Sequence, residues 1–269
     1  MVKNRDEYLI NKIKLENIEV HKKEAAIYDT IHSEIFNKYE QKKTTKDIEF
    51  IAKHISTKNP SALDIGCGTG NLSLKFLKCG FLVTGVDISK EMLDILRNKT
   101  KSRSLKLVKS DVDSFISKCK EKYDVITFSS VLHHLPDYLE TIENATKLLK
   151  ENSIIYITHE PKKQTHQKLS TPFFWMGFTI FDSLLFHTLI LRLKGVKVPK
   201  IDYTWSDYHS RQGIDQKEII NYLGDNNFQI LYYGEYNVRK STILLIIDNK
   251  FNRSKYLFKL IAKKNVGKK

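Results

Sequence analysis

The fold of this chain is decided by the stretch Leu63-Asp64-Ile65-Gly66-Cys67-Gly68-Thr69-Gly70. In it a short apolar run meets an aspartate, three alternating glycines follow, and Asn71 leads into a helical pattern. Glycines in such a turn let backbone amides approach a ligand at the N-terminus of a helix. The stretch therefore predicts a strand, a ligand-binding loop and a helix, in that order.

Short apolar runs alternate with helical patterns on both sides of this loop. Near-continuous apolar strands that alternate with helices predict an α/β fold, a doubly wound parallel sheet covered on both faces. Ligands of such sheets bind beyond the carboxyl ends of the strands. The expected strands are Ala62–Ile65, Leu82–Val86, Leu105–Val108, Tyr123–Phe128, Ile154–Ile157, Phe228–Glu235 and Phe258–Ala262; the expected helices lie within Arg5–Lys43 and at Thr45–His54, Leu72–Lys78, Lys90–Asn98, Val112–Lys120, Asp137–Leu149 and Asp215–Leu223.

The glycine spacing excludes two common cofactor loops. A phosphate-binding P-loop ends in Lys followed by Ser or Thr, whereas Gly70 is followed by Asn71 and Leu72. A dinucleotide fingerprint would need its third glycine at position 71. The loop therefore belongs to another class of ligand.

Two carboxylates indicate which ligand it is. Asp64, beside the first glycine, would repel a pyrophosphate but suits a ligand with an ammonium group. Asp87 ends the second strand, where a carboxylate can accept hydrogen bonds from both hydroxyls of a ribose. An amino acid at one end and a ribose at the other describe S-adenosylmethionine.

With these features, Leu63–Gly70 resembles the signature loop of the class I S-adenosylmethionine-dependent methyltransferases, of the small-molecule and lipid type (type 11/12-like). Three further motifs follow in the family's order: Gly85–Met92, Lys109–Val112 and Tyr123–Leu135. The resemblance covers about residues Tyr28–Ile157. It implies a Rossmann-like, mostly parallel seven-stranded sheet with N-terminal helices and an inserted apolar lid.

The resemblance also implies a cofactor site. Asp111 would accept from the adenine amino group, a backbone amide beside it would bind a ring nitrogen, and Ile88 and Met92 would form an apolar wall. Tyr28 would close over the cofactor. For both Met92 and Tyr28, the alternative is a side chain that only packs in the protein core. The predicted cofactor-binding residues are Tyr28, Asp64, Gly66, Cys67, Gly68, Gly70, Asp87, Ile88, Met92, Asp111, Val112 and Ser129.

His133 and His134 follow the fourth strand and are the candidate catalytic residues. A histidine there can accept a proton from a hydroxyl or ring nucleophile, because its pKa lies near neutrality. The alternative is that Leu-His-His-Leu only shapes the pocket. The three cysteines form no pair with metal-ligand spacing, so no metal site and a reducing cytoplasm are expected.

The segment 172–193 is apolar and aromatic and interrupts the strand and helix alternation. Asp182 near its middle would cost about 2.5 to 3.5 kcal/mol in a bilayer, which argues against a transmembrane span. Three interpretations stay open: a lid over an apolar acceptor pocket, a helix in the membrane interface, and a dimer contact. The expected organisation is a helical cap (1–43), a catalytic domain (44–160 and 214–269) and an inserted lid (161–213).

The chain carries 45 Lys and Arg against 31 Asp and Glu, a net charge of +14. A positive net charge favours binding to anionic partners. The alternative is a lysine-rich surface that is only solvated and binds no specific partner. An apolar lid on a basic protein favours a small or lipophilic acceptor, such as a quinone precursor, a lipid or a lipid-linked glycan, methylated on oxygen or carbon. A cytoplasmic location with peripheral contact to anionic membrane fits it. RNA methylation and a non-catalytic binding subunit are the alternatives, and the oligomeric state stays open.

Overall fold

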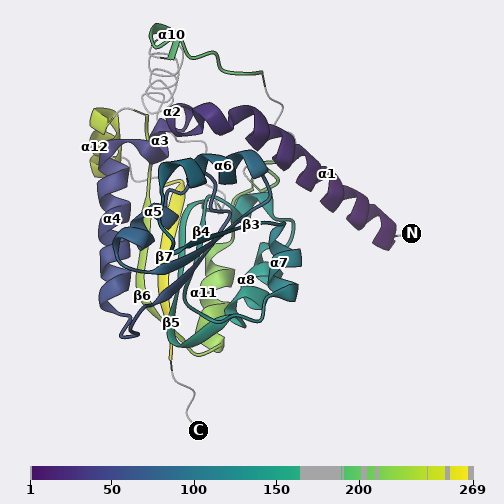
Figure 1. The fold of residues 1–269 in the computed structure, drawn as a ribbon, viewed down its shortest axis with the longest axis vertical. Coiled ribbons are helices and arrows are strands. Elements are labelled where there is room, and N and C mark those ends of the chain that lie inside the picture. The colour runs from purple at the N-terminus through teal and green to yellow at the C-terminus, as the bar shows by residue number, and fades with distance from the viewer. Residues whose placement is uncertain are drawn as a thin grey trace.

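The computed structural model describes residues 2–163, 189, 191–200, 205–209, 212–240, 242–251 and 255–265. Figure 1 shows a sheet with helices on both faces and a long N-terminal helix that extends away from the body. The helices are α1 (Val2–Glu24), η1 (Ala25–Ile27), α2 (Tyr28–Ile31), α3 (Ser33–Phe36), α4 (Lys38–Lys53), α5 (Ser73–Lys78), α6 (Lys90–Lys99), α7 (Val112–Lys118), η2 (Leu132–His134), α8 (Tyr138–Thr146), α10 (Leu191–Leu193), α11 (Gln216–Asp225) and α12 (Thr242–Phe251). The strands are β1 (Ser61–Ile65), β2 (Leu82–Asp87), β3 (Leu105–Lys109), β4 (Tyr123–Ser129), β5 (Leu149–Pro161), β6 (Phe228–Tyr236) and β7 (Leu257–Lys264).

The seven strands form one sheet in the order β3-β2-β1-β4-β5-β7-β6. β1 to β5 run parallel to one another, while β7 runs antiparallel to both β5 and β6. The order reverses between β1 and β4, so the carboxyl ends of these two strands border the crevice where such sheets bind ligands. The predicted doubly wound, mostly parallel sheet is confirmed.

Each face of the sheet carries its own buried core. Side chains of α4 and α5 pack on one face, and side chains of α7, α8 and α11 pack on the other. Because successive side chains of a strand point to opposite faces, apolar residues at every position of a central strand supply both cores. Ala62 and Leu63, adjacent in β1, belong to different cores, and both are fully buried.

Several element boundaries differ from the prediction, and one helix was missed. The helix expected at Thr45–His54 begins seven residues earlier, at Lys38, because the Asn37 side chain caps the amides of Tyr39 and Glu40. The helix expected to reach Leu149 ends at Thr146, and Leu149 already starts β5. The helix α12 was not predicted.

The N-terminal helices lie over the carboxyl edge of the sheet. α1 contacts α6 and runs along the upper edge of the molecule in Figure 1, while α4 flanks the sheet. No described helix combines the length and the hydropathy needed to cross a bilayer. The apolar segment predicted at 172–193 lies outside the described residues, apart from residues 189 and 191–193.

Candidate functional site

A cavity lies over the carboxyl ends of β1 to β4 and is closed from above by α1. Most of the residues predicted to bind the cofactor meet there, although they come from five separate segments of the chain. They are joined by one of the two predicted catalytic histidines. The predicted residues that line this cavity are Tyr28, Gly66, Gly68, Asp87, Ile88, Met92, Asp111, Val112, Ser129 and His134.

A second, smaller cavity adjoins the first at the glycine loop. Asp64 and Cys67 line it, together with Tyr28 and Ser129, which border both cavities. Burial raises the pKa of the Cys67 thiol well above its ordinary value, so this side chain stays protonated and supplies no nucleophile. Gly70 lines neither of these two cavities, and its predicted contact with the cofactor stays a prediction.

Asp87 ties the glycine loop to the start of α6. Its Oδ2 accepts a hydrogen bond from the Gly68 amide at 2.8 Å, and its Oδ1 accepts one from the Ser89 amide at 2.9 Å. Each carboxylate oxygen has a second lone pair, so both can still accept a ligand hydroxyl. Burial raises the pKa of this carboxyl. The geometry is compatible with the predicted ribose contact.

Asp64 forms more hydrogen bonds within the protein than the sequence indicated. Its Oδ2 accepts from the amide and the hydroxyl of Ser73 at 3.0 and 2.6 Å, and its Oδ1 accepts from the Thr127 hydroxyl at 2.9 Å. Burial raises the pKa of Asp64 to about 6 despite these donors. The carboxylate thus joins β1, β4 and the start of α5, and its contact with a ligand ammonium group stays a prediction.

Asp111 begins α7 and faces the cavity. Its Oδ1 accepts from the Ser114 amide at 3.2 Å and from the Lys14 ammonium at 2.8 Å. Lys14 belongs to α1, and Ile13, Asn17 and His21 of the same helix also line the cavity. These four residues were not predicted. The available signal was the spacing of four between residues 13, 17 and 21, which places them on one face of a helix.

His133 is held by a buried carboxylate. Glu160 of β5 is fully buried; its Oε2 accepts from Nδ1 of His133 at 2.9 Å, and its Oε1 accepts from the amides of Val131 and Leu132 at 2.7 and 3.0 Å. Burial acts to lower the pKa of His133, but the hydrogen bond to Glu160 outweighs it and raises the pKa. His133 does not line the cavity; it fixes the turn that carries His134.

His134 faces the cavity from the other side of this turn. Its Nδ1 donates to the backbone carbonyl of Ser206 at 2.5 Å, which leaves Nε2 as the nitrogen with a free lone pair in the neutral ring. Burial, followed by the proximity of His133 and His21, lowers the pKa of His134 well below its ordinary value. The ring is therefore neutral at physiological pH and can accept a proton or a hydrogen bond.

His21 of α1 lies edge-on to His134, with ring centroids 5.7 Å apart. Its Nδ1 is buried and has no hydrogen-bond partner among the described residues. A buried polar atom without a partner is costly and commonly indicates a place for a ligand or an ordered water. His21 and His134 thus give the cavity a polar end opposite its apolar wall of Ile88 and Met92.

His133, His134 and Asp207 also bring one potential metal-ligand atom each within 4.8 Å of one another. The Nδ1 atoms of both histidines already donate to protein oxygens, Glu160 and Ser206. We therefore interpret the group as hydrogen-bonded side chains. The sequence predicted no metal site, and the effect of EDTA on activity tests that prediction.

Comparisons with known proteins agree with this geometry. The family model described as a methyltransferase domain matches residues 36–229. The ubiquinone biosynthesis O-methyltransferase of Coxiella burnetii (strain RSA 493 / Nine Mile phase I) is 31% identical over 112 residues, which are 41% of this chain and 48% of that protein. The chain thus spans about half the length of the curated relatives it matches.

Solved structures share the fold at low sequence identity. The N-methyltransferase NodS from Bradyrhizobium japonicum WM9, in complex with S-adenosylhomocysteine, superposes with a TM-score of 0.58 at 14% identity, over 93% of this chain and 98% of that one. Magnesium protoporphyrin IX methyltransferase from Synechocystis PCC 6803, with bound S-adenosylhomocysteine, gives 0.51 at 19% identity, over 84% and 83%. At these identities the likeness establishes the fold alone.

Proposed function

Because the chain belongs to the methyltransferase domain family, we propose that it is an S-adenosylmethionine-dependent methyltransferase that O-methylates a small or lipophilic acceptor. One observation carries the proposal. The cavity brings together two carboxylates at the ends of β2 and β3, Asp87 and Asp111, an apolar wall, and a neutral imidazole, His134. Asp87 would bind the ribose, Asp111 and the apolar wall the adenine, and His134 the hydroxyl of the methyl acceptor.

The residues present fit the cofactor. Asp87 keeps a free lone pair on each oxygen for two ribose hydroxyls, and Ile88 and Met92 offer the flat apolar surface that a purine requires. Asp111 caps the start of α7, and its carboxylate lines the cavity, where it would accept from an exocyclic amino group. When bound, S-adenosylmethionine supplies an electrophilic methyl group.

His134 takes up the proton that the substrate hydroxyl loses. Methylation of a hydroxyl releases one proton, and Nε2 of a neutral imidazole with Nδ1–H is an acceptor for it. The buried Glu160 and His133 hold the turn that carries this ring. Alignment of the acceptor, the methyl group and its sulfur in the cavity that α1 lines would supply much of the acceleration.

Calorimetric titration with S-adenosylhomocysteine, with NADH as the control ligand, tests the cofactor. We expect binding of the former alone; binding of NADH alone would overturn the proposal. Methyl transfer from labelled S-adenosylmethionine is then assayed on quinone precursors, lipid extracts and RNA. His134→Gln is expected to lower kcat on the productive acceptor by about 100-fold, at the lower end of a general base's contribution.

The same assay in EDTA, and with Mg²⁺ added back, separates a proton acceptor from a cation ligand. We expect equal rates in both. Activity that EDTA abolishes and Mg²⁺ restores would assign the His133, His134 and Asp207 group to a metal ion instead.

Three features support the acceptor class. The matched relatives are named ubiquinone biosynthesis O-methyltransferases, the cavity has an apolar wall, and the chain carries a net charge of +14. We further propose that residues 1–43 act as a cap and 161–213 as a lid, and that the basic surface brings the enzyme to anionic membranes. Sedimentation with vesicles containing anionic lipid, against vesicles of neutral lipid, tests the membrane contact; equal recovery with both would refute it.

A further inference from the structure

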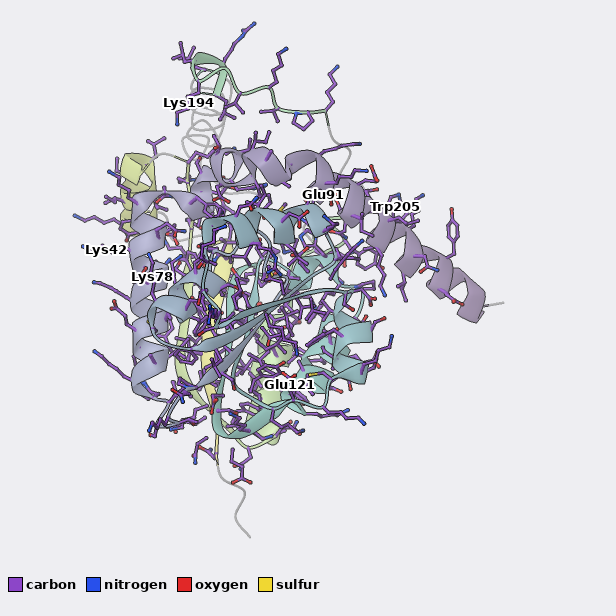
Figure 2. All side chains as sticks on the ribbon, in the orientation of Figure 1. Lys42, Lys78, Glu91, Glu121, Lys194 and Trp205 are labelled. Carbon is purple, nitrogen blue, oxygen red and sulfur yellow. The ribbon has the colours of Figure 1, made fainter. Side chains whose placement is uncertain are left out.

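A short segment joins α1 to the turn that carries the two histidines. We call this segment, Trp205–His209, the strap. The amides of Trp205 and Ser206 both donate to Oε1 of Glu16, each at 2.8 Å. The Lys12 ammonium lies 4.3 Å from the centre of the Trp205 ring, and Figure 2 shows Trp205 beside α1. The N-terminal helix therefore holds the start of the strap.

The rest of the strap is bonded to the histidine turn. The carbonyl of Ser206 accepts from Nδ1 of His134 at 2.5 Å, and the amide of His209 donates to the carbonyl of His133 at 2.8 Å. Ser206 is 1% exposed, so water does not compete for its carbonyl. Glu16 and His134 are thus connected through a single peptide segment.

The Ser206 carbonyl has a chemical consequence for the ring of His134. A carbonyl oxygen carries no hydrogen, so Nδ1 must bear the proton that they share. In a neutral imidazole, Nε2 is then unprotonated. If the carbonyl moved away, the ring would be free to carry its proton on Nε2 and would lose the lone pair it offers to the cavity.

We propose that Glu16 is a positioning residue: through the strap it holds the Ser206 carbonyl against His134, and so keeps Nε2 of that ring unprotonated toward the acceptor. The inference rests on the proposed function, in which His134 accepts the acceptor's proton. It makes the docking of α1 a condition for a competent base, because Glu16 acts from the same helix that closes the cavity with Ile13, Lys14 and His21.

The strength of the contact is consistent with this role. A carboxylate oxygen that accepts from two backbone amides forms charge-assisted hydrogen bonds, which are shorter and stronger than neutral ones. Glu19, three residues further along α1, is exposed and offers a carboxylate control on the same helix. Replacing Glu16 by Gln keeps an acceptor oxygen at the same reach, whereas Asp keeps the charge but is one methylene shorter.

Ring-¹⁵N histidine labelling and nitrogen–proton correlation spectra test the tautomer directly, independently of activity. His134→Gln identifies the resonances of His134. We expect the Nδ1–H tautomer in the wild type, in Glu19→Ala and in Glu16→Gln, and a shift toward Nε2–H in Glu16→Ala and Glu16→Asp. An Nε2–H ring in the wild type, or an unchanged ring in a folded Glu16→Ala, would overturn the inference.

Kinetics then separate positioning from general stability. Glu16→Ala is expected to lower kcat about tenfold, part of the 10²- to 10⁴-fold contribution of a general base, with KM for S-adenosylmethionine changed less than about twofold. In the His134→Gln background the same substitution should cause no further loss, because the two act through one group. Additive losses would contradict positioning. A fully active His134→Gln would instead refute the proposed base, while the tautomer spectra would still decide what Glu16 does to the ring.

Discussion

Replacement of Gly70 by alanine is expected to lower the free energy of unfolding by about 2 to 5 kcal/mol, from two separate terms. Gly70 has φ +96°, a conformation that costs an L-residue about 1 to 2 kcal/mol. A Cβ built there would also lie 2.2 Å from Cδ1 of Leu96, a fully buried side chain that cannot turn toward solvent. Overpacking of this kind costs about 1 to 3 kcal/mol.

Gly80→Ala is the matched control. Gly80 also has a positive φ, +84°, but a Cβ there would meet no atom within 4 Å in the part of the chain that the structure describes. It should therefore lose only the backbone term, about 1 to 2 kcal/mol. Urea unfolding followed by circular dichroism measures both variants. Equal losses for Gly70→Ala and Gly80→Ala would refute the steric argument, whereas in a Leu96→Ala background the Gly70→Ala loss should fall to that of Gly80→Ala.

Three further predictions concern the cap and the cofactor site. Burial acts to lower the pKa of His32, but its hydrogen bonds to Glu24 and Glu34 outweigh burial and raise the pKa to about 9. Because this pKa exceeds the unfolded value of 6.5, protonated His32 stabilises the folded protein at low pH, and this stabilisation is lost as the pH rises from 6.5 through 9. In urea unfolding, the free energy of unfolding of the wild type should fall over this range by up to about 3 kcal/mol relative to His32→Gln. Asp87→Ala should weaken calorimetric binding of S-adenosylhomocysteine by about 1.5 to 3 kcal/mol, and unchanged affinity would disprove the ribose site. Cys67, buried with a raised pKa, should resist a thiol reagent at pH 8 until the chain is unfolded; rapid labelling of the native protein would contradict this.

The sheet was predictable because its signals are local. Each central strand is a short run of consecutive apolar residues, and Asp64 and Asp87 mark the ends of two strands by their position alone. The start of α4 was missed because it depends on one side-chain cap, Asn37, that interrupts no hydrophobic pattern. Strands fixed by burial are therefore predicted better than helix ends fixed by single hydrogen bonds.

Half of the residues that line the cavity were predictable from the sequence, because their signals are also local. Asp87, Asp111 and the glycine loop belong to motifs within one continuous region of the chain, whereas Lys14 and His21 reach the cavity only because α1 folds back over it. No local pattern indicates that Lys14 pairs with Asp111, 97 residues away. The sequence thus indicated the cavity residues at the edge of the sheet better than those that α1 contributes.

The two histidines show how an identical residue type acquires two roles. His133 and His134 are adjacent, and composition cannot distinguish them. Glu160 accepts from Nδ1 of His133 and raises the pKa of that ring, whereas burial lowers the pKa of His134, whose Nδ1 donates to the Ser206 carbonyl. The proximity of His133 lowers the pKa of His134 further, because like charges repel in a buried site. Contacts with β5 and the strap, at Glu160 and Ser206, 26 and 72 residues beyond His134 in the chain, therefore distinguish the proposed proton acceptor from its neighbour.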